Sequence, residues 1–120
     1  MKSIEISTKK DMLFEVVMAR FDILQKNRKS ILNIYKFYRS KPHKSLLLVP
    51  SFLESMILTA QLAKINTNGL NGSLKIKGIF LIYIATFFVW INDNTKTIEK
   101  TMTSLDNYIY RAERIIKNIV

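Results

Sequence analysis

The feature that most constrains this chain is an apolar run of fourteen residues, Gly78–Ile91 (GIFLIYIATFFVWI), which carries no charge. A helix over 73–91 is apolar nearly all round, so other helices or a second copy of the chain must cover it. The run is shorter than the roughly 20 residues that span a bilayer, and Lys75 and Lys77 precede it. We therefore expect the most buried helix of the fold and no transmembrane segment.

Apolar residues recur at helical spacing along the rest of the chain, and only three Gly and two Pro interrupt it. The spacing predicts helices over about 8–26, 28–39, 42–48, 50–64, 73–91 and 95–119. The Asn-Gly pairs at 66–72 predict a loop, since the alternating strands of a hairpin are absent. Pro50 either kinks one helix or separates two. The sequence predicts an all-α bundle of five or six helices in a single domain, 1–120.

The last predicted helix carries a heptad-like seam, in which apolar residues alternate at spacings of four and three. The seam consists of Ile98, Met102, Leu105, Ile109, Ala112, Ile116 and Ile119. Glu113 and Lys117 are four residues apart and can form an ion pair on the solvent-exposed face of this helix.

The residues that carry chemistry are scarce. The chain has no Cys and a single His, His43, which lies between Pro42 and Lys44 in a basic stretch. The nine acidic residues are scattered, and a Gly-rich phosphate loop is absent. We therefore expect no catalytic site, no metal site and no cofactor, and a protein that is not an enzyme.

The charge is strongly positive, with 19 Lys and Arg against nine Asp and Glu, which gives +10. Seven of the basic residues lie between Ile23 and Leu53, where no acidic residue occurs. Such a stretch is either a solvated face or a surface that binds nucleic acid, an anionic membrane or another anion.

Aromatic residues and methionine gather in two of the predicted helices. Such side chains line apolar ligand pockets, and they equally fill cores. The candidate pocket residues are Phe52, Met56, Phe80, Tyr83, Phe87 and Trp90.

Several short segments resemble the C-terminal half of TetR-type transcriptional regulators, of a subgroup common in alphaproteobacteria. The matching pieces are Met18–Gln25, Thr67–Gly72, Leu74–Gly78, Tyr83–Thr86, Val89-Trp90, Asp93, Thr101-Met102, Leu105-Asp106 and Arg111–Arg114. The stretch that resembles the family runs from Met18 to Glu113 and spans about four fifths of the chain. The last helices are also similar to the TetR-fold, lipid-binding accessory protein of ubiquinone biosynthesis.

The resemblance implies a ligand-sensing and dimerisation domain that binds a small apolar or lipid-like molecule; the alternative is a lipid- or quinone-binding accessory protein. It implies a homodimer through the helices over 73–91 and 95–119. The candidate interface residues are Ile82, Ala85, Val89, Met102, Leu105, Ile109, Ala112 and Ile116. The family's DNA-binding headpiece has no counterpart in these residues, so we expect no specific DNA binding by this chain alone. The start of the chain has no signal-peptide pattern, and we expect a cytoplasmic protein.

Overall fold

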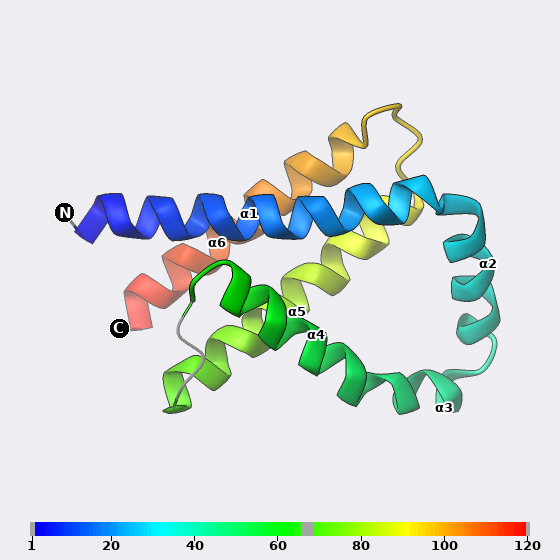
Figure 1. The fold of residues 1–120 in the computed structure, drawn as a ribbon, viewed down its shortest axis with the longest axis horizontal. Coiled ribbons are helices and arrows are strands. Elements are labelled where there is room, and N and C mark those ends of the chain that lie inside the picture. Colours follow the sequence, from blue (N-terminus) through cyan, green and yellow to red (C-terminus); the bar gives the residue numbers. More distant parts are fainter. Residues whose placement is uncertain (1, 66–68, 120) are drawn as a thin grey trace.

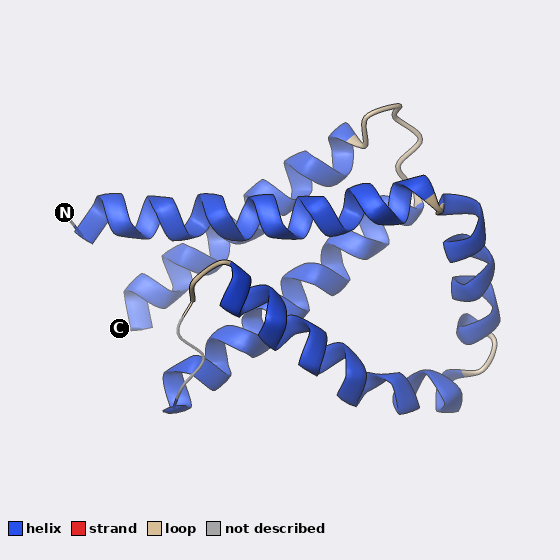
Figure 2. Ribbon diagram, viewed as in Figure 1, coloured by secondary structure: helices blue, strands red, loops and turns tan. Residues whose placement is uncertain are grey.

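A computed structural model describes residues 2–65 and 69–119, and within these ranges the chain is helical without strands (Figure 2). The long helices are α1 (Lys2–Lys26), α2 (Arg28–Arg39), α4 (Val49–Leu62), α5 (Gly69–Ile91) and α6 (Glu99–Ile119). The four-residue helix α3 (Pro42–Ser45) and the 3-10 turn η1 (Leu46–Leu48) lie between α2 and α4. The prediction of an all-α fold is confirmed.

Four of the long helices form the packed body of the molecule. α5 contacts α4 and α6, and α1 contacts the same two helices. α2 turns away at the end of α1, and α3 and η1 lead the chain back into α4, as Figure 1 shows at its right-hand side. No side chain of α2 is buried. The segment α2–α3–η1 is therefore a corner outside the main core.

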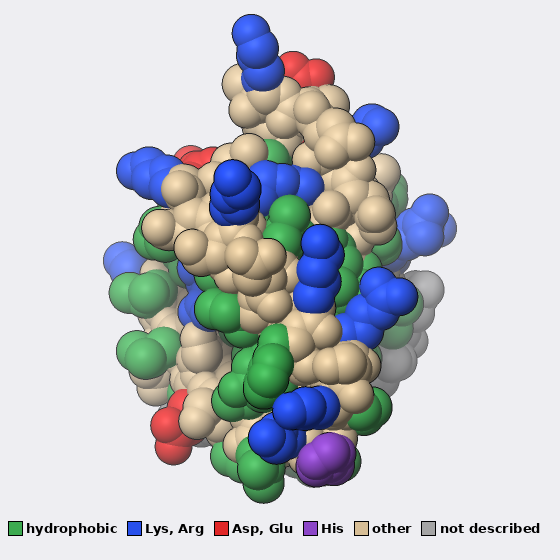
Figure 3. Space-filling view, turned by 90° about the vertical axis from the view of Figure 1, so that its right-hand side faces the viewer, with side chains coloured by type: hydrophobic (Ala, Val, Ile, Leu, Met, Phe, Trp, Pro, Cys, Tyr) green, Lys and Arg blue, Asp and Glu red, His purple; other side chains and the backbone are tan. Residues whose placement is uncertain are grey.

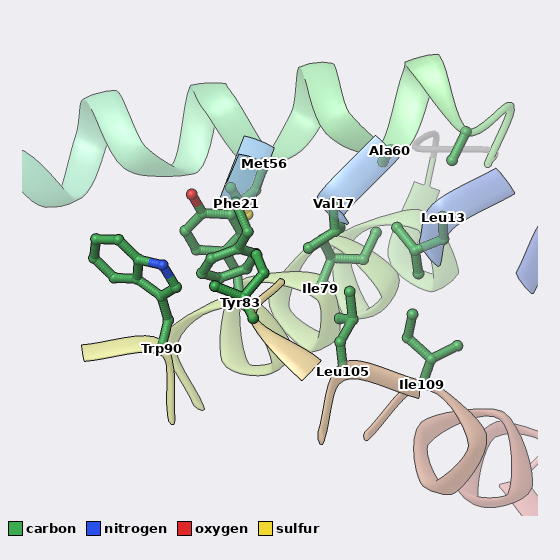
Figure 4. Close-up of a cluster of buried hydrophobic side chains, with 12 residues drawn as sticks. Leu13, Val17, Phe21, Met56, Ala60, Ile79, Tyr83, Trp90, Leu105 and Ile109 are labelled. Carbon is green, nitrogen blue, oxygen red and sulfur yellow. The ribbon is translucent and has the colours of Figure 1, made fainter. Parts of the chain in front are cut away.

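The core lies between α1, α4, α5 and α6 (Figure 4). Its centre is the ring pair Phe21–Tyr83, whose centroids lie 5.0 Å apart in a stacked arrangement. Each large apolar side chain that is buried there contributes about 1.5–3 kcal/mol to folding. The buried apolar side chains are Leu13, Val17, Phe21, Met56, Ala60, Ala63, Ile79, Tyr83, Trp90, Ile98, Leu105 and Ile109.

Three helix starts differ from the prediction, and the first is that of α1, which begins at Lys2 instead of about residue 8. α5 begins at Gly69, which adopts a positive φ of 75°, so the second Asn-Gly pair belongs to the helix and not to the loop. Residues 66–68 of the predicted loop lie outside the described residues. Pro50 lies in the first turn of α4, where its missing N–H costs no hydrogen bond, so it begins a new helix after η1.

The third difference is that α6 begins at Glu99 instead of Thr95, because the carboxylate of Asp93 organises the intervening loop. Its Oδ1 accepts hydrogen bonds from the backbone N–H and the hydroxyl of Thr95, at 3.0 and 2.6 Å. Its Oδ2 accepts from the backbone N–H and the hydroxyl of Thr101, both at 2.8 Å. Asp93 thereby caps the first turn of α6 from a position eight residues earlier in the chain. The loop holds Ile98 at a φ of 48°, which is strained for a β-branched residue.

α5 is not covered on all sides by the single chain. Leu74, Leu81 and Phe88 on this helix are all exposed. The chain has 8561 Å² of accessible surface, whereas a folded monomer of its mass exposes about 6,700 Å². Exposed apolar side chains contribute to this excess, among them Leu74, Leu81 and Phe88 on α5.

The Asp93 network predicts an acid-dependent loss of stability. Burial alone would raise the pKa of Asp93, but the hydrogen bonds from Thr95 and Thr101 lower it from 3.8 to about 2. Because the folded state holds the proton less tightly than the unfolded chain, the carboxylate stabilises the fold above pH 4 by about 2 kcal/mol. This contribution is lost as the pH falls toward 2.

We expect Asp93→Asn to lower the free energy of unfolding at neutral pH by roughly 2–4 kcal/mol. Between neutral pH and acid, the variant should lose less stability than the wild type, because it lacks the carboxylate that titrates. Urea unfolding between neutral pH and acid measures both effects. Asp106→Asn is the control, because Asp106 is exposed on α6, the helix that Asp93 caps. Equal stability of Asp93→Asn and the wild type would contradict the capping role.

Candidate functional site

The six candidate pocket residues lie together along α4 and α5, and they pack against one another. Met56, Tyr83 and Trp90 are buried, whereas Phe52, Phe80 and Phe87 are half-buried. The ring of Phe52 contacts Phe80 and Tyr83 edge-on, at centroid distances of 5.6 and 5.4 Å. Phe87 packs against Trp90 at 5.7 Å. The buried members are therefore part of the core, and the half-buried rings form its edge.

A polar network that sequence reasoning missed holds Trp90 in place. The indole Nε1 of Trp90 donates to the side-chain oxygen of Gln25 at 2.9 Å, and Arg28 donates to the same oxygen at 3.2 Å. Arg28 also donates to the carbonyl oxygens of Trp90 and Ile91, both at 3.1 Å, and its guanidinium stacks 4.7 Å from the indole centroid. A cation at these carbonyls favourably meets the negative end of the α5 dipole. The partners lie more than sixty residues apart, so no local pattern indicates them.

A second arginine, Arg20, joins α1 to α4. Its guanidinium donates to the hydroxyl of Thr59 at 3.1 Å and lies 5.0 Å from the ring centroid of Tyr83. Arg20 and Arg28 are thus both used to connect helices, and Arg28 is one of the seven cations of the acid-free stretch.

The candidate interface residues fall into separate groups. Leu105 and Ile109 are buried inside the single chain, which leaves them no surface to offer to a second chain. Met102 is exposed. The half-buried members are Ile82, Ala85, Val89 and Ala112. The side chains of Ile116 and Lys117 lie outside the part that the structure describes.

The predicted seam of the last helix is buried at Ile98, just before α6, and at Leu105 and Ile109, and it differs from the structure at one position. The buried residues are Ile98, Thr101, Leu105 and Ile109, so Thr101 takes the inward place assigned to Met102. The reason is the carboxylate of Asp93, which binds the hydroxyl and the N–H of Thr101 in the interior.

An apolar seam does exist, on the outward face of α5. Leu74, Gly78, Leu81, Ala85 and Phe88 follow one another at spacings of four, three, four and three, and we call them the α5 seam. Leu81 is 66% exposed, and Leu74 and Phe88 are also exposed. A Cβ added at Gly78 would meet nothing within 4 Å, which shows that the middle of the seam is open.

A second exposed apolar surface lies at the corner formed by α2, α3 and η1. Its exposed apolar residues are Phe37, Leu46, Leu47 and Leu48, and Lys41 and Lys44 lie beside Phe37. We call these six residues the α2–η1 tip. The space-filling view of this side shows hydrophobic and basic side chains next to one another, with His43 at the lower edge (Figure 3). The tip therefore combines apolar and cationic groups in one place.

The described residues offer nothing for metal chemistry. Within residues 2–65 and 69–119, no three His, Asp or Glu side chains lie close enough together to hold a metal ion. His43 is exposed on α3, away from the carboxylate of Asp93 in the α5–α6 loop.

The structure corrects one part of the membrane argument. Gly72–Ile91, with a mean hydropathy of 1.9, and Pro42–Leu62, with 1.5, are long and apolar enough to cross a membrane. The first segment includes Lys75 and Lys77, so the lysines do not end the apolar stretch. Length and composition alone are weak evidence, because core helices pass the same test. The absence of a transmembrane segment stays a prediction.

Comparison with models of known protein families, with curated proteins and with solved structures finds no match to this chain. The resemblance to TetR-type regulators therefore stays a prediction.

The packing of the aromatic cluster predicts the effect of truncating Met56. Because Met56 is fully buried, we expect Met56→Ala to lower the free energy of unfolding by about 2–5 kcal/mol. Leu62→Ala on the same helix is exposed and should change it by less than about 0.5 kcal/mol. Urea unfolding measures both variants. If Met56→Ala were as stable as Leu62→Ala, the expectation that Met56 fills the core would be wrong, and Met56 would instead line an open pocket.

Proposed function

We propose that the chain is a ligand-sensing and dimerisation domain similar to the regulatory half of TetR-type regulators, and that two copies pair through the α5 seam. The observation that carries this proposal is the row of exposed Leu74, Leu81 and Phe88 at heptad spacing. No charged residue interrupts α5 from Gly78 to its end at Ile91.

The geometry of the seam suits a twofold helix pair. Gly78 and Ala85 have small side chains and alternate with the large ones, so two α5 helices can approach closely while the leucines interdigitate. Ile82 and Val89 flank the seam and widen the surface, whereas Leu105 and Ile109 stay in the core of each chain.

The area available is sufficient for a stable dimer. The surface in excess of an ordinary monomer is about 1,900 Å² for each chain, from the 8561 Å² observed. A standard interface buries about 800 Å² on each partner. One α5–α5 contact therefore uses part of the excess.

Ligand sensing is supported by the edge of the aromatic cluster. Phe52, Phe80 and Phe87 are half-buried. Phe52 packs edge-on against Phe80 and the buried ring of Tyr83, and Phe87 packs against the buried ring of Trp90. Small movements of α4 against α5 would open an apolar site between these rings, as suits a small apolar or lipid-like molecule. Such a site adjoins the helix that carries the seam, which couples ligand binding to dimerisation.

The second candidate function is that of a lipid- or quinone-binding accessory protein. The α2–η1 tip favours it, because exposed leucines beside lysines suit the surface of a membrane from which such a ligand is taken.

We expect Leu81→Glu to weaken the dimer by more than a hundredfold, because pairing would bury an unpaired carboxylate in the seam. Leu62→Glu makes the same change at a leucine of similar exposure on α4 and should leave the dimer intact. Native mass spectrometry reports the mass of each variant and any apolar molecule that it retains. A monomeric wild-type chain at micromolar concentration would overturn the dimer, and a dimer without a retained molecule would count against ligand sensing.

A further inference from the structure

We propose that the α2–η1 tip docks the protein reversibly on an anionic membrane surface. The proposal concerns a different face from the α5 seam and does not depend on dimerisation.

The apolar side chains of the tip are strongly exposed to solvent. Leu46 and Leu47 are 70% and 77% exposed, and Leu48 and Phe37 are also exposed. The three leucines form η1, and in a 3-10 turn three successive side chains point in three directions around the axis. At a corner between two helices, such a turn cannot direct all three toward the core. Their exposure is therefore built into the backbone.

The cationic part surrounds the same apolar groups. The Nζ atoms of Lys41 and Lys44 lie 4.7 and 5.7 Å from the centroid of the Phe37 ring. Lys36 and Arg39 are also exposed in the last turn of α2. No acidic residue occurs from Ile23 to Leu53, so these charges have no carboxylate beside them in the chain.

The conformation of the corner is fixed by its own hydrogen bonds. The hydroxyl of Ser45 donates to the carbonyl oxygen of Tyr38 at 3.0 Å, and the hydroxyl of Ser40 donates to that of Phe37 at 2.7 Å. The first bond ties α3 to α2 and the second closes the C-terminal end of α2, so Phe37, its two lysines and η1 stay at one corner of the molecule. A preorganised surface of this kind loses little conformational entropy on binding.

The combination selects a membrane over the other polyanions. Leucine and phenylalanine side chains enter the boundary between headgroups and acyl chains, and lysines extend their ammonium groups to the anionic headgroups. A nucleic acid would engage the lysines by phosphate contacts and would leave Leu46 and Leu47 in water. The tip therefore fits a lipid surface with negative charge.

The experiment is co-sedimentation of the full chain with vesicles of phosphatidylcholine, with and without phosphatidylserine. We expect binding to the anionic vesicles, much weaker binding to the neutral ones, and release by high salt, because the electrostatic attraction is screened.

Two double variants separate the two parts of the tip. Lys41→Gln with Lys44→Gln should weaken binding to anionic vesicles about 25-fold, at roughly fivefold for each cation. Leu46→Ser with Leu47→Ser should weaken it at least about tenfold. Circular dichroism and thermal unfolding should match the wild type, because Lys44, Leu46 and Leu47 are exposed and Lys41 is only half-buried.

Matched controls make the same changes elsewhere. Lys96→Gln with Lys100→Gln alters two exposed lysines near the start of α6, on the opposite edge of the molecule from α3 (Figure 1). Leu62→Ser with Leu70→Ser alters leucines that are 64% and 81% exposed at the end of α4 and the start of α5. We expect both controls to bind vesicles like the wild type.

Four results would overturn the proposal. They are equal binding to neutral and anionic vesicles, leucine variants that bind like the wild type, controls that lose binding as the tip variants do, and protein that stays with the membrane in alkaline carbonate. The last result would identify an embedded segment. The proposal would also fail if a DNA duplex displaced the protein from vesicles and if the leucine variants bound that duplex as tightly as the wild type does. Those two results together would identify the tip as a nucleic-acid surface.

Discussion

The structure depends on how the C-terminal end of α5 is held. The buried indole of Trp90 donates to Gln25, and Arg28 joins that amide to the last carbonyls of the helix. Three residues after Trp90, the carboxylate of Asp93 caps α6. One short stretch thereby fixes α5 relative to α1, α2 and α6. A buried indole N–H or carboxylate without partners would cost several kcal/mol, so these bonds select one arrangement of the helices.

The inward face of α1 is predictable because it follows from spacing. Leu13, Val17 and Phe21 lie in the core as their spacing predicts. The start of α6 is not predictable in the same way, because it is decided by the carboxylate of Asp93, which binds the N–H of Thr101 eight residues later in the chain. Met102 and Thr101 have adjacent positions, and spacing alone favours the apolar one. The hydrogen bonds of Asp93 outweigh that preference and turn Thr101 inward.

The aromatic cluster shows a different limit of sequence reasoning. Several of its rings are in contact, but residue type does not distinguish a ring that fills a core from one that borders a ligand site. Burial separates them in the structure, with Met56 inside and Phe52 at the edge. On α5, composition likewise could not show that one apolar side meets the core and the other meets solvent. The two sides differ only in position around the helix.

The two exposed apolar surfaces of the molecule are chemically distinct, and this difference bears on their partners. The α5 seam has large and small side chains in regular alternation and no charge beyond Lys77, which suits the complementary surface of an identical helix. The α2–η1 tip has leucines at irregular angles among lysines, so no identical copy complements its charge. Pairing of two α2–η1 tips would bring lysines of like charge together and would be repulsive. An anionic membrane attracts the same lysines. On the proposals made here, the same apolar driving force leads to a protein partner at one surface and to a lipid partner at the other.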